Sequence, residues 1–344
     1  MSFLPDSTEL GPLGWDSRVA DRLAALAVAG GVPGRVVRVD LDSCTVATAE
    51  GDHRVHTRTA PAVGDWVIAR LDAAPSVLGV APRWSEVARR DPSGLTQVLA
   101  ANVDLVLIAA PADRLSPARV ERETAIAWDG GAIPIVLLTK CDLAPDELVR
   151  ELRSRLVGVE VLPVSSVSGE GKSDLAALLQ PALTAVLLGP SGAGKSSLTN
   201  LLLGRDALAT GPVRSGDHRG RHVTTARELF VVPTGGVLID TPGLRSLALP
   251  TDHGGVSSAF PDVEALAVHC RFHDCRHVTE PDCAVLAAAD SGTLDGGRLA
   301  NYRKLRRELD FTLRRDDPSV ARENRKLWKG RAKAARQLRR ERGH

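Results

Sequence analysis

Apolar and polar positions follow two different patterns along this chain. In residues 34–83, short runs rich in valine, threonine and isoleucine alternate with polar positions and are separated by turn residues. Alternation with a period of two is typical of strands that bury one face. Many short strands of this kind indicate a small closed sheet, so we predict a five-stranded, OB-like β-barrel over residues 34–90.

Residues 103–203 have the second pattern, in which continuous apolar runs alternate with amphipathic segments. Runs that are apolar at every position match strands covered on both faces. We therefore predict an α/β domain over residues 91–250, built on a parallel sheet with flanking helices. The polar segment 85–101 is interpreted as a connector. The predicted strands lie at 103–109, 133–139, 159–164 and 185–188, and the predicted helices at 117–128, 145–156, 172–179 and 197–203.

Length and composition indicate a multidomain globular protein. The chain has 344 residues, of which 43% are hydrophobic and 25% charged, enough for a sizeable core. No apolar run reaches the roughly 18 residues of a membrane helix, and the first residues lack a basic region followed by an apolar core. We therefore expect a cytoplasmic protein with no membrane partner.

The net charge of +2 is unevenly distributed. Residues 301–344 hold 16 Lys and Arg against 6 Asp and Glu, so this segment carries +10 and the preceding 300 residues carry −8. A basic tail is typical of a chain end that meets a polyanion, although a solvated charged helix has the same composition. In the predicted barrel, basic residues favour RNA binding over mere packing against a neighbour: Arg35, Arg38, Arg54, His56 and Arg58.

A glycine-rich loop follows the apolar run 185–188. Gly189, Gly194, Lys195 and Ser196 fit the G-x-x-x-x-G-K-[ST] pattern of a phosphate-binding loop. Its backbone N–H groups surround phosphate oxygens, Lys195 reaches the outer phosphates as a catalytic residue, and the Ser196 hydroxyl ligates Mg²⁺. The chain is therefore predicted to bind a nucleoside triphosphate through Gly189, Pro190, Ser191, Gly192, Ala193, Gly194, Lys195, Ser196 and Ser197.

Two short motifs at the ends of predicted strands indicate that the base is guanine. Thr139, Lys140 and Asp142 belong to a TKCD element, and Ser165 and Ser166 follow the next strand. Ligands of open α/β sheets bind at such strand ends. The Asp142 carboxylate can accept hydrogen bonds from guanine N1–H and the 2-amino group, which adenine does not offer. A serine backbone N–H would contact guanine O6, and the serine hydroxyls would brace Asp142.

Two further motifs follow the phosphate loop. In segment 220–225, either Thr224 or Thr225 would complete the Mg²⁺ shell. Segment 236–243 is predicted to be a strand that ends in Asp-Thr-Pro-Gly. Asp240 would hold Mg²⁺ through water, and the Gly243 N–H would contact the γ-phosphate.

A Cys/His cluster lies near the carboxyl-terminal end of the chain. Three of the five cysteines fall within 14 residues, which in a cytosolic chain favours metal binding. Three thiolates and one imidazole close a tetrahedral shell around Zn²⁺, so the site would be structural. The cysteines are Cys270, Cys275 and Cys283, and the spacing leaves His269, His273 and His277 open as the nitrogen ligand.

Together these motifs are the elements of a Ras-like GTPase in a permuted order, because base recognition precedes the phosphate loop. Such a permutation keeps the sheet and moves the termini. With VGDWV at 63–67 and QVLAANVDLVLI at 97–108, the chain resembles the ribosome small-subunit-dependent GTPase A family (RsgA type). Members of that family are circularly permuted GTPases that act late in small-subunit assembly.

The resemblance implies hydrolysis of GTP to GDP that is stimulated by the small ribosomal subunit and drives release from its rRNA. It also implies one structural Zn²⁺ with His277 as the fourth ligand, and Mg²⁺ bound with GTP. We expect a monomer with an extension (1–33), the barrel, the GTPase domain, a helical zinc-binding domain (251–310) and a basic tail (311–344). The alternative is a passive rRNA-binding assembly protein whose nucleotide site is mainly structural.

Three positions depart from the usual GTPase pattern. Val223 stands where many relatives carry another threonine, which leaves Thr224 or Thr225 as the Mg²⁺ ligand. Thr139 replaces the more usual asparagine of the guanine motif, which should weaken its bracing but not the pairing of Asp142. Leu244 stands where Ras-like enzymes place a water-orienting glutamine, so we expect slow intrinsic hydrolysis. His222 is a candidate catalytic replacement because its ordinary pKa suits the role, and a phosphate or RNA contact is the alternative role for it.

Overall fold

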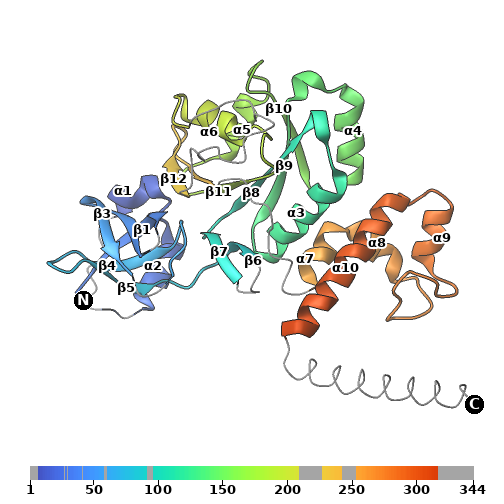
Figure 1. Ribbon diagram of the computed structural model, residues 1–344, viewed down its shortest axis with the longest axis horizontal. Coiled ribbons are helices and arrows are strands. Elements are labelled where there is room, and N and C mark those ends of the chain that lie inside the picture. Colours follow the sequence, from blue (N-terminus) through green and yellow to red (C-terminus); the bar gives the residue numbers. More distant parts are fainter. Residues whose placement is uncertain are drawn as a thin grey trace, which may run out of the picture.

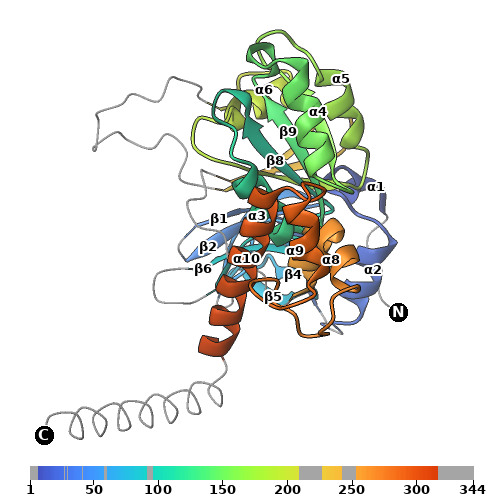
Figure 2. The ribbon, with the colours of Figure 1, turned by 90° about the vertical axis from the view of Figure 1, so that its right-hand side faces the viewer.

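The computed structural model describes residues 7–26, 28, 30–40, 42–57, 60–90, 96–208, 227–241 and 253–316. A β-barrel, a central α/β sheet and a group of helices follow one another in the molecule (Figure 1, Figure 2). Most of the basic tail and several predicted site residues lie outside the described residues: Arg58, His222, Thr224, Thr225, Gly243 and Leu244.

The amino-terminal barrel is closed. β1 pairs with β2, β2 with β3, β3 with β5 and β5 with β4, and the pairing of β4 with β1 completes the ring. Alternate side chains fill its interior with a core that includes Val36, Val46 and Val67. The predicted five-stranded barrel is therefore confirmed, with strands β1 (Val32–Val39), β2 (Ser43–Thr48), β3 (Gly51–His56), β4 (Trp66–Arg70) and β5 (Ser76–Val80).

Short helices before the barrel pack on its outer surface. They are α1 (Ser7–Leu10), η1 (Gly11–Leu13) and α2 (Ser17–Ala24). The ring of Trp15 lies edge-on to Trp66 of β4, with centroids 5.4 Å apart. This segment is therefore part of the barrel's hydrophobic packing.

The central sheet has the strand order β10-β9-β8-β11-β13-β12. The first five strands are parallel, as predicted, and β12 runs antiparallel to β13. β12 was not predicted. The strands are β8 (Leu105–Pro111), β9 (Ile133–Thr139), β10 (Glu160–Val164), β11 (Thr184–Leu188), β12 (Glu228–Val231) and β13 (Val237–Asp240).

Helices cover both faces of this sheet. Val106 and Ile108 of β8 pack in one core with residues of α3 and α4, whereas Leu107 between them packs in a second core with residues of α5 and α6. This alternation explains why the strands are apolar at every position. The helices are α3 (Pro117–Asp129), α4 (Asp146–Arg155), α5 (Lys172–Leu178) and α6 (Lys195–Leu203).

The barrel and the central sheet are joined at β1. Arg38 of β1 pairs with Glu228 of β12, which makes the two parts one continuous 11-stranded sheet. Arg35 of β1 is fully buried at this junction, and its Nη2 donates to Thr184 Oγ1 at 2.8 Å. Burial lowers the Arg35 pKa to about 10. The expectation that Arg35 faces RNA is therefore wrong, because its guanidinium connects the barrel to the start of β11.

The segment predicted as a connector contains a hairpin. β6 (Glu86–Arg90) and β7 (Thr96–Ala101) pair antiparallel as a separate sheet. Val87 and Leu99 are fully buried, so the hairpin buries one side against the central core. The polar residues of the other side led to the incorrect connector prediction.

The carboxyl-terminal part is helical, as predicted, with α7 (Gly254–Ala259), α8 (Pro261–Ala267), α9 (Ala284–Asp290) and α10 (Gly296–Asp316). Its core includes Phe260, Leu305 and Ala125, the last from α3 of the central domain. A Cβ on Gly255 would lie 2.5 Å from the Ala125 carbonyl oxygen, so α7 approaches the α3 backbone directly. None of the described helices is long and apolar enough to cross a membrane.

Candidate nucleotide and metal sites

The predicted nucleotide motifs follow the carboxyl ends of parallel strands. The phosphate loop follows β11, Asp240 ends β13, the TKCD element begins at the end of β9, and the serine pair follows β10. The register places Thr139 beside Val164 and Leu187 beside Asp240. Strand pairing therefore gathers these motifs on one edge of the sheet, where open α/β sheets bind ligands.

Glycines shape the phosphate loop. Gly189 has φ +136°, and a Cβ there would lie 2.6 Å from the Ala109 carbonyl oxygen. Gly194, with φ +86°, is the N-cap residue of α6 and has no side chain that could cap the first-turn N–H groups. These N–H groups remain available to an anion at the amino-terminal end of the helix.

Lys195 lies between the phosphate loop and Asp240. Its Nζ donates to the carbonyl oxygens of Gly189 at 2.9 Å and Pro190 at 3.0 Å. Burial lowers the Lys195 pKa, and the charge of Asp240 opposes that shift. Burial raises the Asp240 pKa, and Lys195 opposes it in turn. Each charge therefore offsets part of the effect of burial on the pKa of the other, at the point where β11 and β13 end.

Oxygen donors suited to Mg²⁺ lie beside this ammonium group. Ser196 begins α6 with Lys195, and Asp240 is 6% exposed at the end of β13. The Thr241 hydroxyl donates to the Leu187 carbonyl oxygen at 2.8 Å, which anchors the Asp240 end of β13 to β11. A carboxylate and a hydroxyl are ligands that Mg²⁺ accepts in phosphate sites, so the described residues fit that ion.

A cleft of about 550 Å³ extends from the phosphate loop to the guanine motif. Leu143 and Val167 line it and are 64% and 87% exposed, which leaves apolar surface for a planar base. The predicted residues that line this cleft are Lys140, Asp142, Ser165, Ser166, Gly192, Gly194 and Ser197. A carboxylate at the base end and N–H groups at the phosphate end suit a guanine nucleotide.

Thr139 and Ser165 stabilise the loops that form the cleft. The Thr139 hydroxyl donates to the Ala193 carbonyl oxygen of the phosphate loop at 2.8 Å, and the side chain is buried. The Ser165 hydroxyl oxygen accepts from the N–H groups of Val167 and Ser168, both at 3.1 Å. Thr139 thus links the guanine motif to the phosphate loop, and Ser165 shapes the loop after β10.

Sequence reasoning missed four residues of the cleft. Two are the apolar Leu143 and Val167, and the others are Asp113 and Arg114, which lie in η2 (Ala112–Arg114) after β8. Asp113 Oδ2 lies 2.6 Å from Lys140 Nζ, and Arg114 Nη2 donates to the Ser191 carbonyl oxygen at 2.6 Å. Asp113 and Arg114 follow the central strand of the parallel sheet, and ligands bind at such strand ends, so their sequence position could have predicted that they line the cleft.

The second site is the Cys/His cluster, whose ligand atoms all lie within 4.8 Å of one another. Sγ of Cys270 lies 3.7 Å from Sγ of Cys283 and 3.6 Å from Nδ1 of His277. A tetrahedral Zn²⁺ with bonds of roughly 2.0–2.3 Å needs ligand atoms about 3.5–3.8 Å apart. The four residues fit such an ion, and they are Cys270, Cys275, His277 and Cys283.

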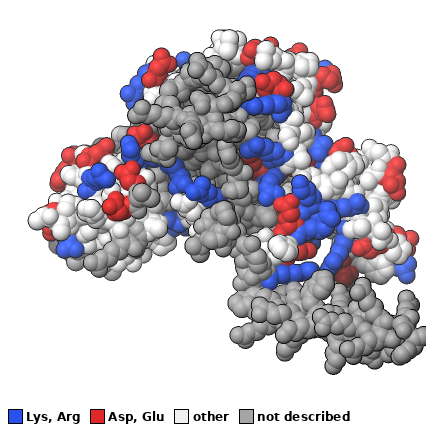
Figure 3. Space-filling model, viewed as in Figure 1, with Lys and Arg blue, Asp and Glu red and all other residues white. Residues whose placement is uncertain are grey.

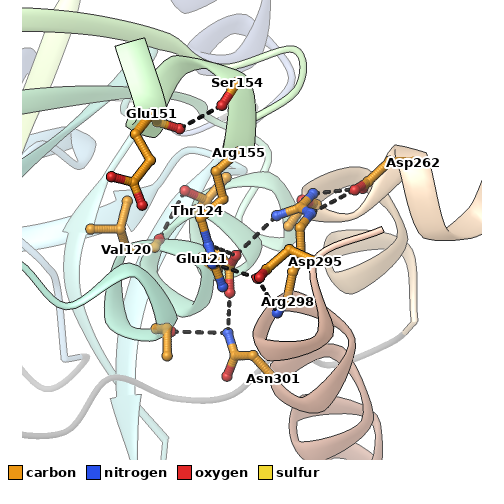
Figure 4. Close-up of polar contacts among 12 residues, drawn as sticks. Val120, Glu121, Thr124, Glu151, Ser154, Arg155, Asp262, Asp295, Arg298 and Asn301 are labelled. Atoms are coloured by element: carbon orange, nitrogen blue, oxygen red, sulfur yellow. Dashed lines mark hydrogen bonds and ion pairs between the residues drawn. The ribbon is translucent and has the colours of Figure 1, made fainter. Parts of the chain in front are cut away.

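A buried network connects the central domain to the carboxyl-terminal helices (Figure 4). The fully buried Glu121 of α3 accepts from Arg298 Nη1 at 3.1 Å and Asn301 Nδ2 at 2.5 Å, both on α10. Arg155 of α4 also donates to Glu121, at 2.7 Å. Arg298 in turn pairs with Asp262 of α8 at 2.7 Å. The two parts therefore share a polar core as well as an apolar one.

A parallel sheet with a phosphate loop after β11 and a guanine-type motif after β9, earlier in the chain, defines a circularly permuted P-loop GTPase. The family model described as RsgA GTPase matches residues 80–250. The small ribosomal subunit biogenesis GTPase RsgA of Streptomyces coelicolor is 46% identical over 94% of this chain and 92% of its own. The protein of the same name from Opitutus terrae is 42% identical over 93% of this chain and 95% of its own.

Solved structures agree in fold. YjeQ from Thermotoga maritima superposes with a TM-score of 0.58 at 23% identity, over 80% of this chain and 98% of its own. YloQ, described as a circularly permuted GTPase, superposes with a TM-score of 0.57 at 23% identity, over 82% of this chain and 96% of its own. The chain belongs to the RsgA family of GTPases.

Proposed function

We propose that this protein binds the small ribosomal subunit, acts late in its assembly in the cytoplasm, and leaves it when GTP is hydrolysed. The observation that carries the proposal is the cleft that extends from Asp142 to the phosphate loop, because its lining suits GTP. The names of the relatives from Streptomyces coelicolor and Opitutus terrae support the small ribosomal subunit as the partner.

Recognition of GTP is proposed to begin at the base. The exposed Asp142 accepts hydrogen bonds from guanine N1–H and the 2-amino group, and Leu143 and Val167 pack against the ring. The phosphate chain then lies along the N–H groups that begin α6, with Lys195 at the outer phosphates. Adenine does not offer the two donors that Asp142 requires, so ATP is rejected.

Hydrolysis is proposed to use charge stabilisation by the phosphate loop together with a water-orienting group. Lys195 leaves its two loop carbonyl partners for the phosphate oxygens, where its charge stabilises the transition state. Mg²⁺ held by Ser196, by either Thr224 or Thr225, and by Asp240 through water would neutralise developing charge on the phosphates. The Gly243 N–H contacts the γ-phosphate. His222 remains our candidate for orienting water, since Leu244 cannot do so.

The cluster of three cysteines and His277 is proposed to hold one structural Zn²⁺. The four ligands leave no position for substrate, which supports a structural role. By fixing the loop between Cys270 and Cys283, the ion would present the neighbouring basic side chains to rRNA. The basic tail is proposed to make further phosphate contacts.

The nucleotide state is proposed to reach the carboxyl-terminal helices by two routes. One is the segment after Asp240, which leads along the chain to α7. The other is α3, which begins just after Asp113 and Arg114 of the cleft and carries Glu121 into the buried network with α10. A nucleotide that alters the position of α3 would therefore alter the surface offered to rRNA.

The alternative is a passive rRNA-binding protein whose nucleotide site only stabilises its fold. Affinity for purified small subunits, measured with a non-hydrolysable GTP analogue and with GDP, separates the two functions. We expect at least about tenfold tighter binding with the analogue, which corresponds to about 1.4 kcal/mol of coupling. Equal affinity in both nucleotide states would support the passive function.

A further inference from the structure

A basic cavity lies between α10 and the loop that carries the Cys/His cluster. Its volume is about 680 Å³. Two aspartates, Asp274 and Asp310, also line it, so the charged lining carries a net +3 without the histidines. Figure 3 shows Lys and Arg gathered over α10 on the face seen in Figure 1. The arginines that line the cavity are Arg276, Arg303, Arg306, Arg307 and Arg314.

The spacing of these arginines on α10 is that of one helix face. Arg306 and Arg307 lie three and four residues after Arg303, and Arg314 lies seven residues after Arg307. Residues at these intervals share one face of a helix. With a rise of about 1.5 Å per residue, this face extends about 16 Å, which is longer than a single phosphate group. The basic lining therefore suits an extended polyanion.

Arg303 is the unusual member of the set. Its Nε and Nη2 atoms are buried and have no hydrogen-bond partner among the described residues. Its neighbour Arg306 donates to the Tyr302 hydroxyl at 3.1 Å and lies 3.9 Å from Glu264 Oε1. A buried guanidinium edge without an acceptor is destabilising, and nearly all buried polar groups in proteins have a hydrogen-bond partner.

Asp310, which also lines the cavity, does not supply the missing acceptor to Arg303. Its Oδ1 lies 3.5 Å from His253 Nε2. Nε and Nη2 of Arg303 form one edge of the guanidinium group, and its two parallel N–H donors match two oxygens of one phosphate group once the side chain turns this buried edge into the cavity. Tyr302 is 3% exposed, so its ring has no open face on which a base could stack. The cavity would therefore recognise the sugar-phosphate backbone of a nucleic acid.

We propose that this cavity binds the phosphodiester backbone of RNA, with a phosphate oxygen pair completing the hydrogen bonds of Arg303. The proposal rests on the rRNA binding proposed above and names the site. RNA is favoured over an acidic peptide because the guanidinium groups follow one another along a helix face, as phosphates follow one another along a strand.

Substitution of Arg303 separates RNA binding from folding. Arg303→Met keeps most of the side-chain volume and removes the unpaired charge. We expect its melting temperature to equal or exceed that of the wild type, because the destabilising buried donors are gone. Its affinity for small subunits should nevertheless fall about tenfold.

The test measures binding of the fluorescently labelled full chain to purified small subunits and to isolated small-subunit rRNA between 50 and 200 mM salt. Loss of one phosphate contact should reduce the slope of log affinity against log salt by about 0.7–0.9. Arg307→Met, on the same helix face, should also reduce the slope. Arg271→Met is the matched control, since Arg271 pairs with Asp282 and does not line the cavity. Metal content and melting temperature are measured for each variant.

The outcomes are distinct. An Arg303→Met protein that binds with wild-type affinity and slope overturns the cavity proposal while the proposed function stands. Affinity that falls with an unchanged salt slope excludes an RNA backbone. Affinity, melting temperature and metal content that fall together in Arg303→Met, with an unchanged Arg307→Met slope, indicate a structural role and also overturn it. A wild-type protein that binds neither subunits nor rRNA contradicts the proposed function itself.

Discussion

The hydroxyl of Thr139 donates to the carbonyl oxygen of Ala193 at 2.8 Å, across 54 positions of sequence. This bond ties the guanine motif after β9 to the phosphate loop after β11. It also refines the expectation that threonine at this position weakens the bracing, because the shorter side chain still reaches the loop. Both ends of the nucleotide cleft are therefore held by one buried hydrogen bond.

Thr139→Val should weaken GTP binding. The substitution keeps the shape of the side chain but leaves the Ala193 carbonyl oxygen without this donor, which costs about 1–2 kcal/mol or roughly a 5- to 30-fold loss of affinity. Titration with a fluorescent GTP analogue measures the change. Thr124→Val is a matched control, because the Thr124 hydroxyl is bonded to Val120 within α3. Equal GTP affinity for Thr139→Val and the wild type would show that the bond does not organise the cleft.

Asp142→Asn should exchange guanine for xanthine. An amide offers one acceptor and one donor, which match the N1–H and the 2-oxo group of xanthine but oppose the 2-amino group of guanine. We expect affinity for GTP to fall about 100-fold and XTP to become the better ligand, as judged by competition binding. Asp146→Asn, an exposed position at the start of α4, serves as control. Retained preference for GTP would remove Asp142 from base recognition.

Glu121→Ala should destabilise the whole described fold. Arg298 and Arg155 both donate to this fully buried carboxylate, and removal of one partner from a buried ion pair costs about 3–5 kcal/mol. Urea unfolding followed by circular dichroism gives the free energy. Glu147→Ala removes an exposed pair with Arg150, which should change stability by less than about 1 kcal/mol. Similar losses in the two variants would contradict a central role for the network.

Removal of the metal should unfold the loop between Cys270 and Cys283 while GTP binding persists. The ligands of the cluster come from residues 270–283, whereas the nucleotide cleft is lined by residues 113–197. Chelation or Cys283→Ser is expected to abolish stoichiometric zinc and to lower the melting temperature. His269→Ala leaves the cluster intact and should keep the metal. Loss of zinc from His269→Ala with retention in His277→Ala would reverse the choice of nitrogen ligand.

Sequence pattern was sufficient where a signal is local. The run 133–139 is apolar at nearly every position because β9 is covered on both faces, and the observed strand has the predicted bounds. Gly189, Gly194 and Lys195 are recognisable because the phosphate loop needs positive φ angles and a cation at fixed spacing. Cys270 and Cys283 are likewise close in sequence, so the cluster was predictable.

Contacts between distant segments were not predictable in this way. β12 is four residues long, and its role as the link to β1 depends on a partner 190 positions away. Arg35 was assigned to RNA from its charge, yet its strand position places it in the interior. Glu121 and Arg298 are 177 positions apart, and a glutamate within an amphipathic helix ordinarily faces water.

The proposed function requires that the small ribosomal subunit stimulates GTP hydrolysis by this protein. Its most direct test is the rate of phosphate release from GTP by the full chain, with and without purified small subunits, with Lys195→Ala as the inactive control. We expect slow turnover alone and at least about tenfold faster turnover with subunits, because Leu244 cannot orient water and the bound subunit would complete the site. A rate that is unchanged by subunits, in protein that binds both GTP and subunits, would show that the subunit does not stimulate hydrolysis.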